Sequence, residues 1–354
     1  MQYHRIVVDA MGGDHAPLEI VKGALQACKA SPSIQCVFVG DEAAISDIIR
    51  REKKLKVDPK RWEIVHTTET INMEEDPKIG IEEKPEASIL VAARLIRDGK
   101  GDALVSAGST GATIMACSRE IPRIPSIERG VLAAIFPAMK QDDTTPGVSI
   151  MLDVGATLHC TVNQLVSFAI MGIQYLKAIM AVENPRVGLL NIGTEETKGH
   201  NVLVETNKTL RSMKQLNFIG NIEGKDIMRG NADVIVTEGY IGNVALKSLE
   251  GMAELTIQTG KQIWKKNLLS KTGLIMLSPV LKKLKKRMDY SEHGGAPILG
   301  FRKLVIKAHG RSEAKAIMNA VLLAEKSIKS NLIGNMEHSI RDFYINLFDS
   351  EVQK

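Results

Sequence analysis

A lysine in a glycine-punctuated loop is the residue whose surroundings most favour chemistry. Lys198 lies within the stretch from Arg186 to Asn201, which reads RVGLLNIGTEETKGHN. The apolar run at 187–190 predicts a short strand that is buried on both faces, as in a parallel sheet. Open α/β sheets bind their ligands at the carboxyl ends of such strands. A lysine there can neutralise an oxyanion or a phosphate as a compact point charge, with an ordinary surface lysine as the alternative.

Four other strand ends combine polar residues with glycine in the same way. They run from Asp9 to Asp14, from Ser106 to Gly111, from Asp153 to Ala156 and from Thr237 to Asn243. Backbone N–H groups in such loops can hold a phosphate, while Lys198 supplies charge and Asn243 a neutral donor. The sequence contains no GxSxG motif, no GK[ST] ending, and no cysteine with a histidine at a catalytic or metal-binding spacing. Direct transfer onto phosphate is therefore favoured over covalent catalysis.

The candidate site residues are the polar and glycine residues of these loops. Lys198 and Asn243 are the candidate catalytic residues. The candidates for binding substrate or phosphate are Asp9, Gly12, Gly13, Asp14, His15, Ser106, Gly108, Ser109, Thr110, Gly111, Asp153, Gly155, Thr194 and Glu238.

Two of the loops share the pattern D-x-x-V-[ST]-x-G-x-x-G. Asp102, Val105, Ser106, Gly108 and Gly111 match Asp233, Val236, Thr237, Gly239 and Gly242. The match indicates two related halves with strand ends facing one site. Chance convergence of strand–loop–helix units is an equal alternative, since few such solutions exist.

Alternating strands and helices are expected to position these loops. Strands are predicted at 5–10, 35–40, 62–66, 101–107, 131–136, 148–152, 187–190, 217–220 and 304–306. Helices are predicted at 17–30, 41–54, 87–97, 162–176 and 244–266. This alternation predicts one three-layer α/β/α catalytic unit over residues 1–354 with a mainly parallel sheet. A turn-rich segment at 141–147 predicts a hairpin, so the sheet should be mixed.

Composition narrows the class of protein. The chain has 354 residues, 44% hydrophobic and 25% charged, with a net charge of +5, which are globular values and too weakly basic to indicate nucleic-acid binding. Four cysteines without a CxxC pair are typical of reduced, buried thiols in a cytoplasmic protein. No signal peptide and no apolar run of transmembrane length is present.

Residues 267–288 differ from the rest of the chain. An apolar cluster that includes Leu274, Ile275 and Leu277 precedes a helix with Leu281 on one face and basic residues such as Lys282 and Lys283 around it. This amphipathic pattern predicts a membrane-associating segment, with a solvated helix lying on the core as the alternative.

Seven blocks of sequence resemble the acyl-ACP:phosphate acyltransferases of bacterial phospholipid synthesis. They read IVVDAMGGDHAP, LVSAGSTGA, LDVGA, RVGLLNIGTEETKG, TEGYIGNVALK, YSEHGGAPILG and VIKAHGRS. They occur in the family's order, and the first and the last are separated by nearly the whole length of the chain. The resemblance implies an α/β/α fold of the isocitrate/isopropylmalate dehydrogenase type with intertwined halves, shared with phosphotransacetylases, in a homodimer. We expect no cofactor and no metal, since no Cys/His ligand spacing is present. The family's essential lysine and asparagine match Lys198 and Asn243.

The same resemblance implies a reaction and its partners. A fatty acyl group passes from the thioester of acyl carrier protein to inorganic phosphate, and a membrane glycerol-3-phosphate acyltransferase consumes the acyl phosphate. The family's membrane-associating segment falls on 267–287, which favours peripheral membrane association of this cytoplasmic protein.

The chain departs from the family's pattern in two loops. A basic run that ends in two serines in the family reads Glu82-Glu83-Lys84-Pro85-Glu86-Ala87-Ser88 here. After LDVGA, the family's Asn-x-Asp-x-Lys-Pro-Glu is replaced by Thr157, His159, Thr161, Val162 and Asn163. These two loops carry less positive charge than in the family, which bears on how acyl carrier protein would dock. The expected reaction is less affected, because the blocks that contain Lys198 and Asn243 are intact.

Two other functions remain open. A phosphotransacetylase acting on acyl-CoA differs only in its donor. A non-catalytic membrane scaffold that recruits acyl carrier protein would need neither the glycine loops nor Lys198. A dehydrogenase of the same fold is disfavoured, because the sequence lacks an acidic triad for a divalent metal with nearby arginines.

Overall fold

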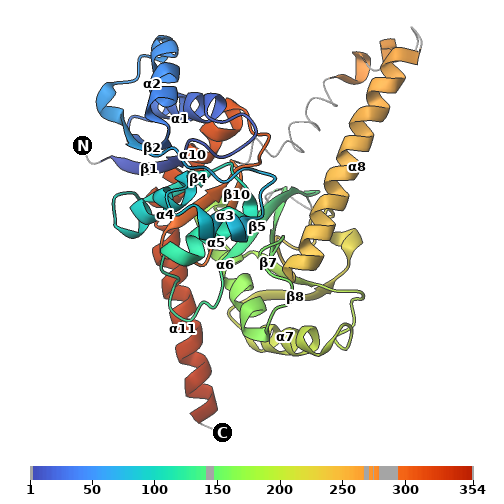
Figure 1. Cartoon of the computed structure of the whole chain (residues 1–354). Coiled ribbons are helices and arrows are strands. Elements are labelled where there is room, and N and C mark those ends of the chain that lie inside the picture. Colours follow the sequence, from blue (N-terminus) through green and yellow to red (C-terminus); the bar gives the residue numbers. More distant parts are fainter. Residues whose placement is uncertain (1–2, 141–146, 267–270, 274, 279–293, 353–354) are drawn as a thin grey trace.

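The computed structural model describes residues 3–140, 147–266, 271–273, 275–278 and 294–352. Within these residues the strands form one 11-stranded sheet in the order β3-β2-β1-β4-β11-β10-β5-β6-β9-β7-β8 (Figure 1). The strands are β1 (His4–Asp9), β2 (Ile34–Gly40), β3 (Trp62–His66), β4 (Ala103–Ser106), β5 (Val131–Pro137), β6 (Val148–Leu152), β7 (Arg186–Leu190), β8 (Asn217–Ile222), β9 (Val234–Val236), β10 (Ala296–Leu299) and β11 (Leu304–Lys307).

Strand direction confirms the predicted mixed sheet. The pairs formed by β1, β2, β3, β4 and β11 on one side, and by β6, β7, β8 and β9 on the other, are parallel. The centre is antiparallel, where β5 pairs with β6 and with β10, and β10 pairs with β11. Within each side, the carboxyl ends of the parallel strands therefore lie at one edge. The three antiparallel pairs between the two sides make the two sets of parallel strands run in opposite directions.

Helices cover both faces of the sheet. They are α1 (Leu18–Ala30), α2 (Glu42–Arg51), α3 (Pro77–Glu83), α4 (Ser88–Arg97), α5 (Thr110–Glu120), α6 (Val162–Met180), α7 (Asn201–Ser212), α8 (Gly239–Lys266), α10 (Ala314–Lys329) and α11 (Leu332–Val352). One core joins α1, α6 and α10 to strand residues such as Val8 and Val105. A second core joins α4 and α5 to the alternate residues Val7 and Leu104. Successive side chains of a strand thus point alternately into the two apolar cores, one on each face of the sheet. This confirms the three-layer α/β/α prediction.

Most predicted elements are confirmed, and α8 shows the largest shift of a boundary. The sequence predicts a start at residue 244, whereas the helix begins at Gly239. Glycine is a poor helix former, so the sequence favours a loop there. Packing overrides this preference, since an added Cβ at Gly242 would lie 1.8 Å from Asp153 O. Asn243 is consequently a helical residue.

Three further differences have local causes. The predicted helix 41–54 ends at Arg51, and the one-turn 3₁₀ helices η1 (Lys53–Leu55) and η2 (Pro59–Arg61) follow it. The polar stretch before residue 87, for which the sequence predicts no element, contains α3, which Asp76 caps through Lys78 N and Ile79 N. The strand β10 is also absent from the sequence prediction, because Pro297 disfavours a strand assignment.

The repeated segments make matching contacts in the two halves of the sheet. Asp102 Oδ2 accepts from Arg5 N at 2.8 Å, and Asp102 N donates to Arg5 O at 2.7 Å. Asp233 Oδ2 likewise accepts from Arg186 N at 2.8 Å, and Asp233 N donates to Arg186 O at 2.8 Å. These contacts place β1 and β4 in one half where β7 and β9 lie in the other. They support two related halves within one unit, which stays a prediction.

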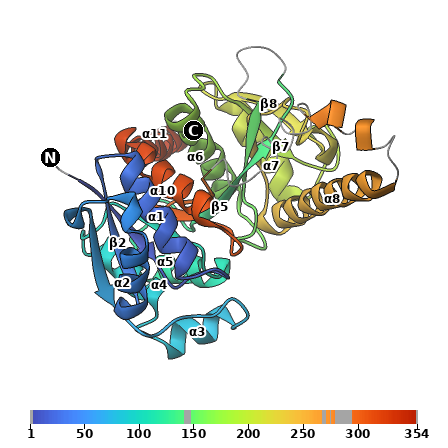
Figure 2. The same ribbon diagram turned by 90° about the horizontal axis from the view of Figure 1, so that it is seen from above.

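Two helices extend away from the sheet: α8 (Figures 1 and 2) and the C-terminal part of α11 (Figure 1). The apolar helix α6 lies inside the molecule, where it packs against α11, α7 and β9. None of the described helices combines the length and the hydropathy needed to cross a membrane.

Candidate active site

The first cluster of predicted site residues surrounds Asp9, the last residue of β1. Its carboxylate is 1% exposed and accepts hydrogen bonds from Ser88 Oγ and Ser106 Oγ, each at 2.7 Å. Burial raises the pKa of Asp9, and the two hydroxyl donors partly oppose this rise because they favour the ionised form. Because Ser106 is the last residue of β4 and Ser88 the first of α4, the Asp9 carboxylate connects the end of β1 to both elements.

Glycines allow three loops to meet at this carboxylate. A Cβ at Gly12 would lie 2.5 Å from Asp9 Oδ2, so no side chain fits there. Gly13 has a φ of +112°, which favours glycine, and the next residue, Asp14, donates its N–H to Gly310 O at 2.9 Å. Gly108 N donates to Ser106 Oγ at 3.1 Å. The loops after β1, β4 and β11 are thus joined.

The predicted polar residues of these loops are more accessible than Asp9. Asp14 and His15 are exposed, and Ser109, Thr110 and Gly111 are partly exposed where α5 begins. The Ser109 and Thr110 residues are thus partly accessible where α5 begins, in the loop that follows the buried Ser106. The predicted residues of the first half therefore do come together.

The second cluster surrounds Asp153, which follows β6. Its buried Oδ1 accepts from Gly155 N and Ala156 N, both at 3.0 Å, and from Leu132 N at 3.3 Å. Burial raises the pKa of Asp153 and the backbone donors partly oppose it. A Cβ added at Gly155 would lie 3.5 Å from Asn243 Oδ1. The loop held by Asp153 is thus in contact range of the candidate catalytic amide.

Glu238 connects the second cluster to the loop of Lys198. This carboxylate is 6% exposed. Its Oε1 accepts from Cys160 N at 3.0 Å, and its Oε2 lies 3.1 Å from His200 Nε2. Because Glu238 directly precedes α8, one side chain ties together the loop after β6, the loop after β7 and the helix that carries Asn243. We call this contact the Glu238–His200 link.

Lys198 itself projects from a well-anchored loop. Its side chain is 47% exposed, and its Nζ lies 3.9 Å from Glu195 Oε1. Asn191 Nδ2 donates to Lys198 O at 2.9 Å, and Asn221 Nδ2 donates to Glu195 O at 2.7 Å. The backbone is therefore fixed while the ammonium group remains accessible, and Thr194 in the same loop is exposed. Such a lysine can meet a substrate without first breaking a buried ion pair.

These hydrogen bonds divide the predicted residues into two clusters, whereas the sequence predicts strand ends that face one site. The helix α8 spans them, because Arg311 after β11 lies 3.8 Å from Glu254 on α8. Burial lowers the pKa of His309, and Glu250 on α8 partly opposes this. The loop after β11 is thus in contact with α8, the helix that begins at the second cluster.

Sequence reasoning missed several residues of the two clusters. They are Ser88, Thr157, Cys160, His200 and Lys307. Ser88 and Thr157 fall in the two loops that depart from the family, and Lys307 falls in the VIKAHGRS block. The sequence marks these positions as departures from the family or as part of a family block. Only the fold shows that Ser88 contacts Asp9 and that Cys160 and His200 contact Glu238.

The chemistry of Cys160 disfavours covalent catalysis by this thiol. It is buried beside Thr157, with Sγ 3.2 Å from Thr157 Oγ1. Burial raises the pKa of Cys160 to about 11, so the thiol form predominates at neutral pH. All four cysteines are buried and free of disulfides. In the part of the chain that the structure describes, no group of three or more potential ligands is placed to hold a metal ion.

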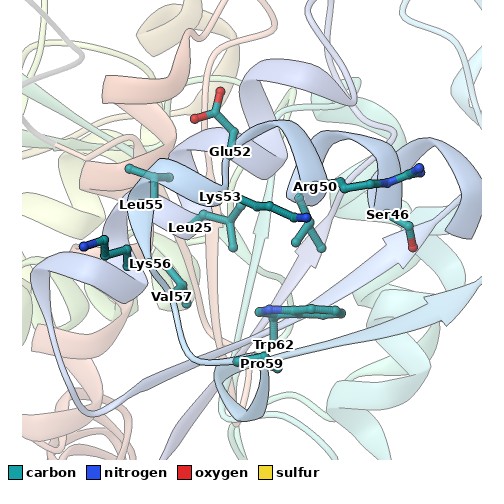
Figure 3. Close-up of a pocket in the computed structure, with 11 residues that line it drawn as sticks. Leu25, Ser46, Arg50, Glu52, Lys53, Leu55, Lys56, Val57, Pro59 and Trp62 are labelled. Carbon is teal, nitrogen blue, oxygen red and sulfur yellow. The ribbon is translucent and has the colours of Figure 1, made fainter.

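A surface pocket of about 320 Å³ lies between α1, α2 and β3 (Figure 3). Its lining includes Leu25, Ile49, Leu55, Val57 and Trp62, with Arg50 and Lys53 beside them. None of the lining residues belongs to either strand-end cluster. The pocket therefore contributes nothing to the candidate active site.

Comparison with solved structures assigns the class of fold. A EutD phosphotransacetylase from Staphylococcus aureus matches with a TM-score of 0.55 and 16% identity, over 92% of this chain and 94% of that chain. A branched-chain phosphotransacylase from Enterococcus faecalis V583 matches with a TM-score of 0.54 and 14% identity, over 93% and 99%. At these identities the likeness shows the fold alone, which is that of the phosphotransacylases.

Sequence comparison assigns the family. The model of the family described as "Fatty acid synthesis protein" matches residues 4–335. A phosphate acyltransferase from Thermoanaerobacter pseudethanolicus is 40% identical over 95% of this chain and 97% of its own length. Another from Dictyoglomus turgidum is 44% identical over 92% and 94%. The chain belongs to this family of fatty acid synthesis proteins, together with these phosphate acyltransferases.

Proposed function

We propose that the protein transfers a fatty acyl group from the thioester of acyl carrier protein to inorganic phosphate. The family and the fold support acyl transfer to phosphate. The observation that carries the assignment to this site is the Glu238–His200 link, which fixes the Lys198 loop beside the helix of Asn243. One accessible cation and one amide donor are thereby presented on rigid supports.

These two groups suit the charge that develops during the reaction. A phosphate oxygen attacks the thioester carbonyl carbon, and the carbonyl becomes a tetrahedral oxyanion. Collapse of this intermediate re-forms the carbonyl and breaks the C–S bond, and the departing thiolate takes up a proton. Lys198 neutralises the oxyanion or the phosphate, and the Asn243 amide donates a hydrogen bond to it. The glycine loops provide backbone N–H groups for the phosphate.

The donor and the partners rest on the family resemblance. We assign acyl carrier protein as donor, a membrane glycerol-3-phosphate acyltransferase as the consumer of acyl phosphate, and a homodimer as the working form. The two loops whose sequences differ from the family's pattern affect where the donor can dock. Glu82 and Glu83 are exposed at the end of α3, and Thr161 caps α6 through Gln164 N at 3.2 Å. A donor protein that docks through acidic residues is therefore not expected to bind at the end of α3.

The proposed function is tested by incubating the purified protein with phosphate and a fatty acyl thioester, and detecting acyl phosphate by mass spectrometry. Thioesters of acyl carrier protein and of coenzyme A are compared at equal concentration. A clear preference for acyl-CoA would assign a phosphotransacetylase. Absence of acyl phosphate with both donors would leave the non-catalytic scaffold as the better hypothesis.

Loss of the Glu238–His200 link should reduce turnover without unfolding the protein. For His200→Ala we expect kcat to fall roughly tenfold, because misplaced catalytic groups lose rate steeply. The His200 side chain is half exposed, so the free energy of unfolding should change little. His200→Gln, whose amide can donate to Glu238, should recover part of the loss. Equal kcat for all three proteins, measured with saturating substrates, would contradict a positioning role.

Membrane association is a separate part of the proposal. Of the predicted segment, Leu274, Leu281, Lys282 and Lys283 lie outside the described residues. The described part, 271–273 and 275–278, is helical, and Ile275, Met276 and Leu277 are more than half exposed. Trp264, near the end of α8, is also exposed. Exposed apolar residues at the end of a projecting helix support peripheral contact with a bilayer.

The membrane prediction concerns these exposed side chains. Wild-type protein should sediment with anionic vesicles, less strongly at high salt, because each basic residue near the surface contributes about 1 kcal/mol that salt screens. The double variant Ile275→Glu/Leu277→Glu should remain in the supernatant, since carboxylates oppose insertion. Its turnover on a soluble donor should match wild type. Unchanged sedimentation of the variant would show that this helix does not enter the interface.

A further inference from the structure

The surface pocket between α1, α2 and β3 lies outside both strand-end clusters, and its volume is about 320 Å³ (Figure 3). Ligand pockets of proteins span about 300–1,000 Å³, and they combine an apolar lining with a few polar groups. The strand β3 lies at one edge of the sheet, whereas β7, which precedes the Lys198 loop, is next to the opposite edge. A ligand in this pocket would therefore bind far from the candidate catalytic residues.

The apolar lining comes from three elements and the connection between two of them. Leu25 of α1 is buried, and Ile49 of α2 and Trp62 of β3 pack against the same core while remaining partly exposed. The short helices η1 and η2 connect α2 to β3, and this connection adds Leu55 and Val57 to the lining. An indole and aliphatic side chains around a cavity of this size favour an apolar ligand, because the ligand removes their surface from water.

The rim of the pocket is basic. Residues 50–61 contain seven lysines and arginines and two acidic residues. Arg50 in the lining lies 3.6 Å from Asp47, whereas the ammonium groups of Lys53 and Lys56 form no ion pair with any residue that the structure describes. Both lysines are exposed. Two cations without a protein counter-charge at the mouth of an apolar pocket favour an anionic head group on the ligand.

The local conformation and the nearest acidic residue leave this positive charge available. Lys56 follows η1 with a φ of 53°, in the left-handed region that glycine and asparagine adopt most readily, so the backbone gives no reason for a lysine there. Glu52 is the acidic member of the described lining, and Figure 3 shows its carboxylate directed away from the Trp62 ring. The charge of the rim is therefore not cancelled inside the pocket.

We propose that this pocket binds the anion of a single-chain fatty acid, with its chain against Trp62 and its carboxylate at Lys53 and Lys56. The volume is at the lower end of the range for ligand pockets, which suits one alkyl chain. Ser46 supplies the one neutral polar side chain of the described lining, so a nucleotide base would lack the several hydrogen bonds that fix its orientation.

This site is separate from the sites assigned above. Figures 1 and 2 place α2 and the far end of α8 on opposite sides of the molecule, so the pocket is not part of the proposed membrane contact. The inference goes beyond the proposed acyl transfer and does not depend on it, because binding of a fatty acid can be measured without a thioester or phosphate.

The Trp62 indole can report occupation of the pocket directly. The chain has two tryptophans, so Trp264→Phe leaves Trp62 as the only indole. ω-Bromododecanoate, kept below its critical micelle concentration, should quench the Trp62 emission saturably, because bromine quenches an indole that it contacts. ω-Bromohexanoate at the same concentration should not, since the loss of each buried CH₂ lowers affinity about fourfold. Absence of saturable quenching by the longer acid would overturn the proposal.

The contribution of the rim is tested in the same Trp264→Phe background. Lys53→Glu/Lys56→Glu should raise the Kd for ω-bromododecanoate roughly tenfold, because two exposed attractions become repulsions. The matched control is Lys29→Glu/Lys54→Glu, whose exposed lysines lie outside the lining, and its Kd should stay within about threefold of the background. Both double variants should melt near the background protein. Equal Kd values for the two would contradict recognition of an anion at this rim.

Filling the pocket tests where the chain lies. Ser46 lines the pocket from α2, whereas Ala43 is exposed on the same helix and does not line it. Ser46→Phe places a ring in the space of the alkyl chain and should weaken binding of ω-bromododecanoate at least roughly tenfold, whereas Ala43→Phe should bind it as the background does. If both variants bound the acid equally well, the acid would occupy another surface and the proposal would be wrong.

Discussion

Replacing Lys198 with alanine is expected to lower kcat about 10²–10³-fold, the typical cost of removing one preorganised stabiliser of an oxyanion. The fold should persist, because the Lys198 side chain is half exposed and its loop is held by Asn191 and Asn221 through backbone oxygens that the substitution retains. The substitution removes a long, exposed ion pair with Glu195, and such a pair contributes little to stability. Acyl phosphate formation under saturating substrates measures the effect.

Lys208→Ala provides the control for Lys198→Ala. Lys208 is an exposed lysine on α7, the helix that follows the Lys198 loop, so the control changes the same charge nearby. Its kcat and melting temperature should match wild type. If Lys198→Ala kept half of the wild-type kcat, Lys198 would be an ordinary surface lysine and the catalytic assignment would be wrong.

The strand ends were the most predictable part of this protein. A strand that is buried on both faces has a continuous apolar sequence, and the polar loop after it contains glycines. The strand β7 and the Lys198 loop can therefore be predicted from the sequence alone. The start of α8 was not visible in this way. Its glycines favour a loop locally, and only packing against the residues after β6 makes them helical.

The composition of the two clusters was less predictable, because it depends on register and long-range packing. Ser88 lies 79 residues from Asp9 along the chain, yet its hydroxyl donates to that carboxylate. The hydrogen bond between His200 and Glu238 spans 38 residues. Neither Ser88 nor His200 belongs to a local sequence motif from which its hydrogen-bond partner could be predicted. A resemblance to a family identifies blocks such as VIKAHGRS but does not show that Lys307 lies in register with Ser106.

Replacement of Asn243 should be as damaging as replacement of Lys198, and it tests whether an amide donor is required. Asn243→Ala removes the donor, and we expect kcat to fall about 10²-fold or more. Asn243→Asp keeps the size of the side chain, but a carboxylate accepts hydrogen bonds and repels phosphate, so it should be no more active than alanine.

Stability should not confound the comparison of the Asn243 variants. Asn243 is exposed in the first turns of α8, where alanine is a good helix former and aspartate interacts favourably with the helix dipole. Both variants should therefore melt near wild type, as should the control Ser248→Ala, which changes an exposed residue farther along α8 and should keep full activity. An Asn243→Asp enzyme as active as wild type would show that no hydrogen bond donated by this side chain reaches the reacting oxygens. Because Gly155 lies beside the amide, the side chain would then serve only to fix α8 against the loop after β6.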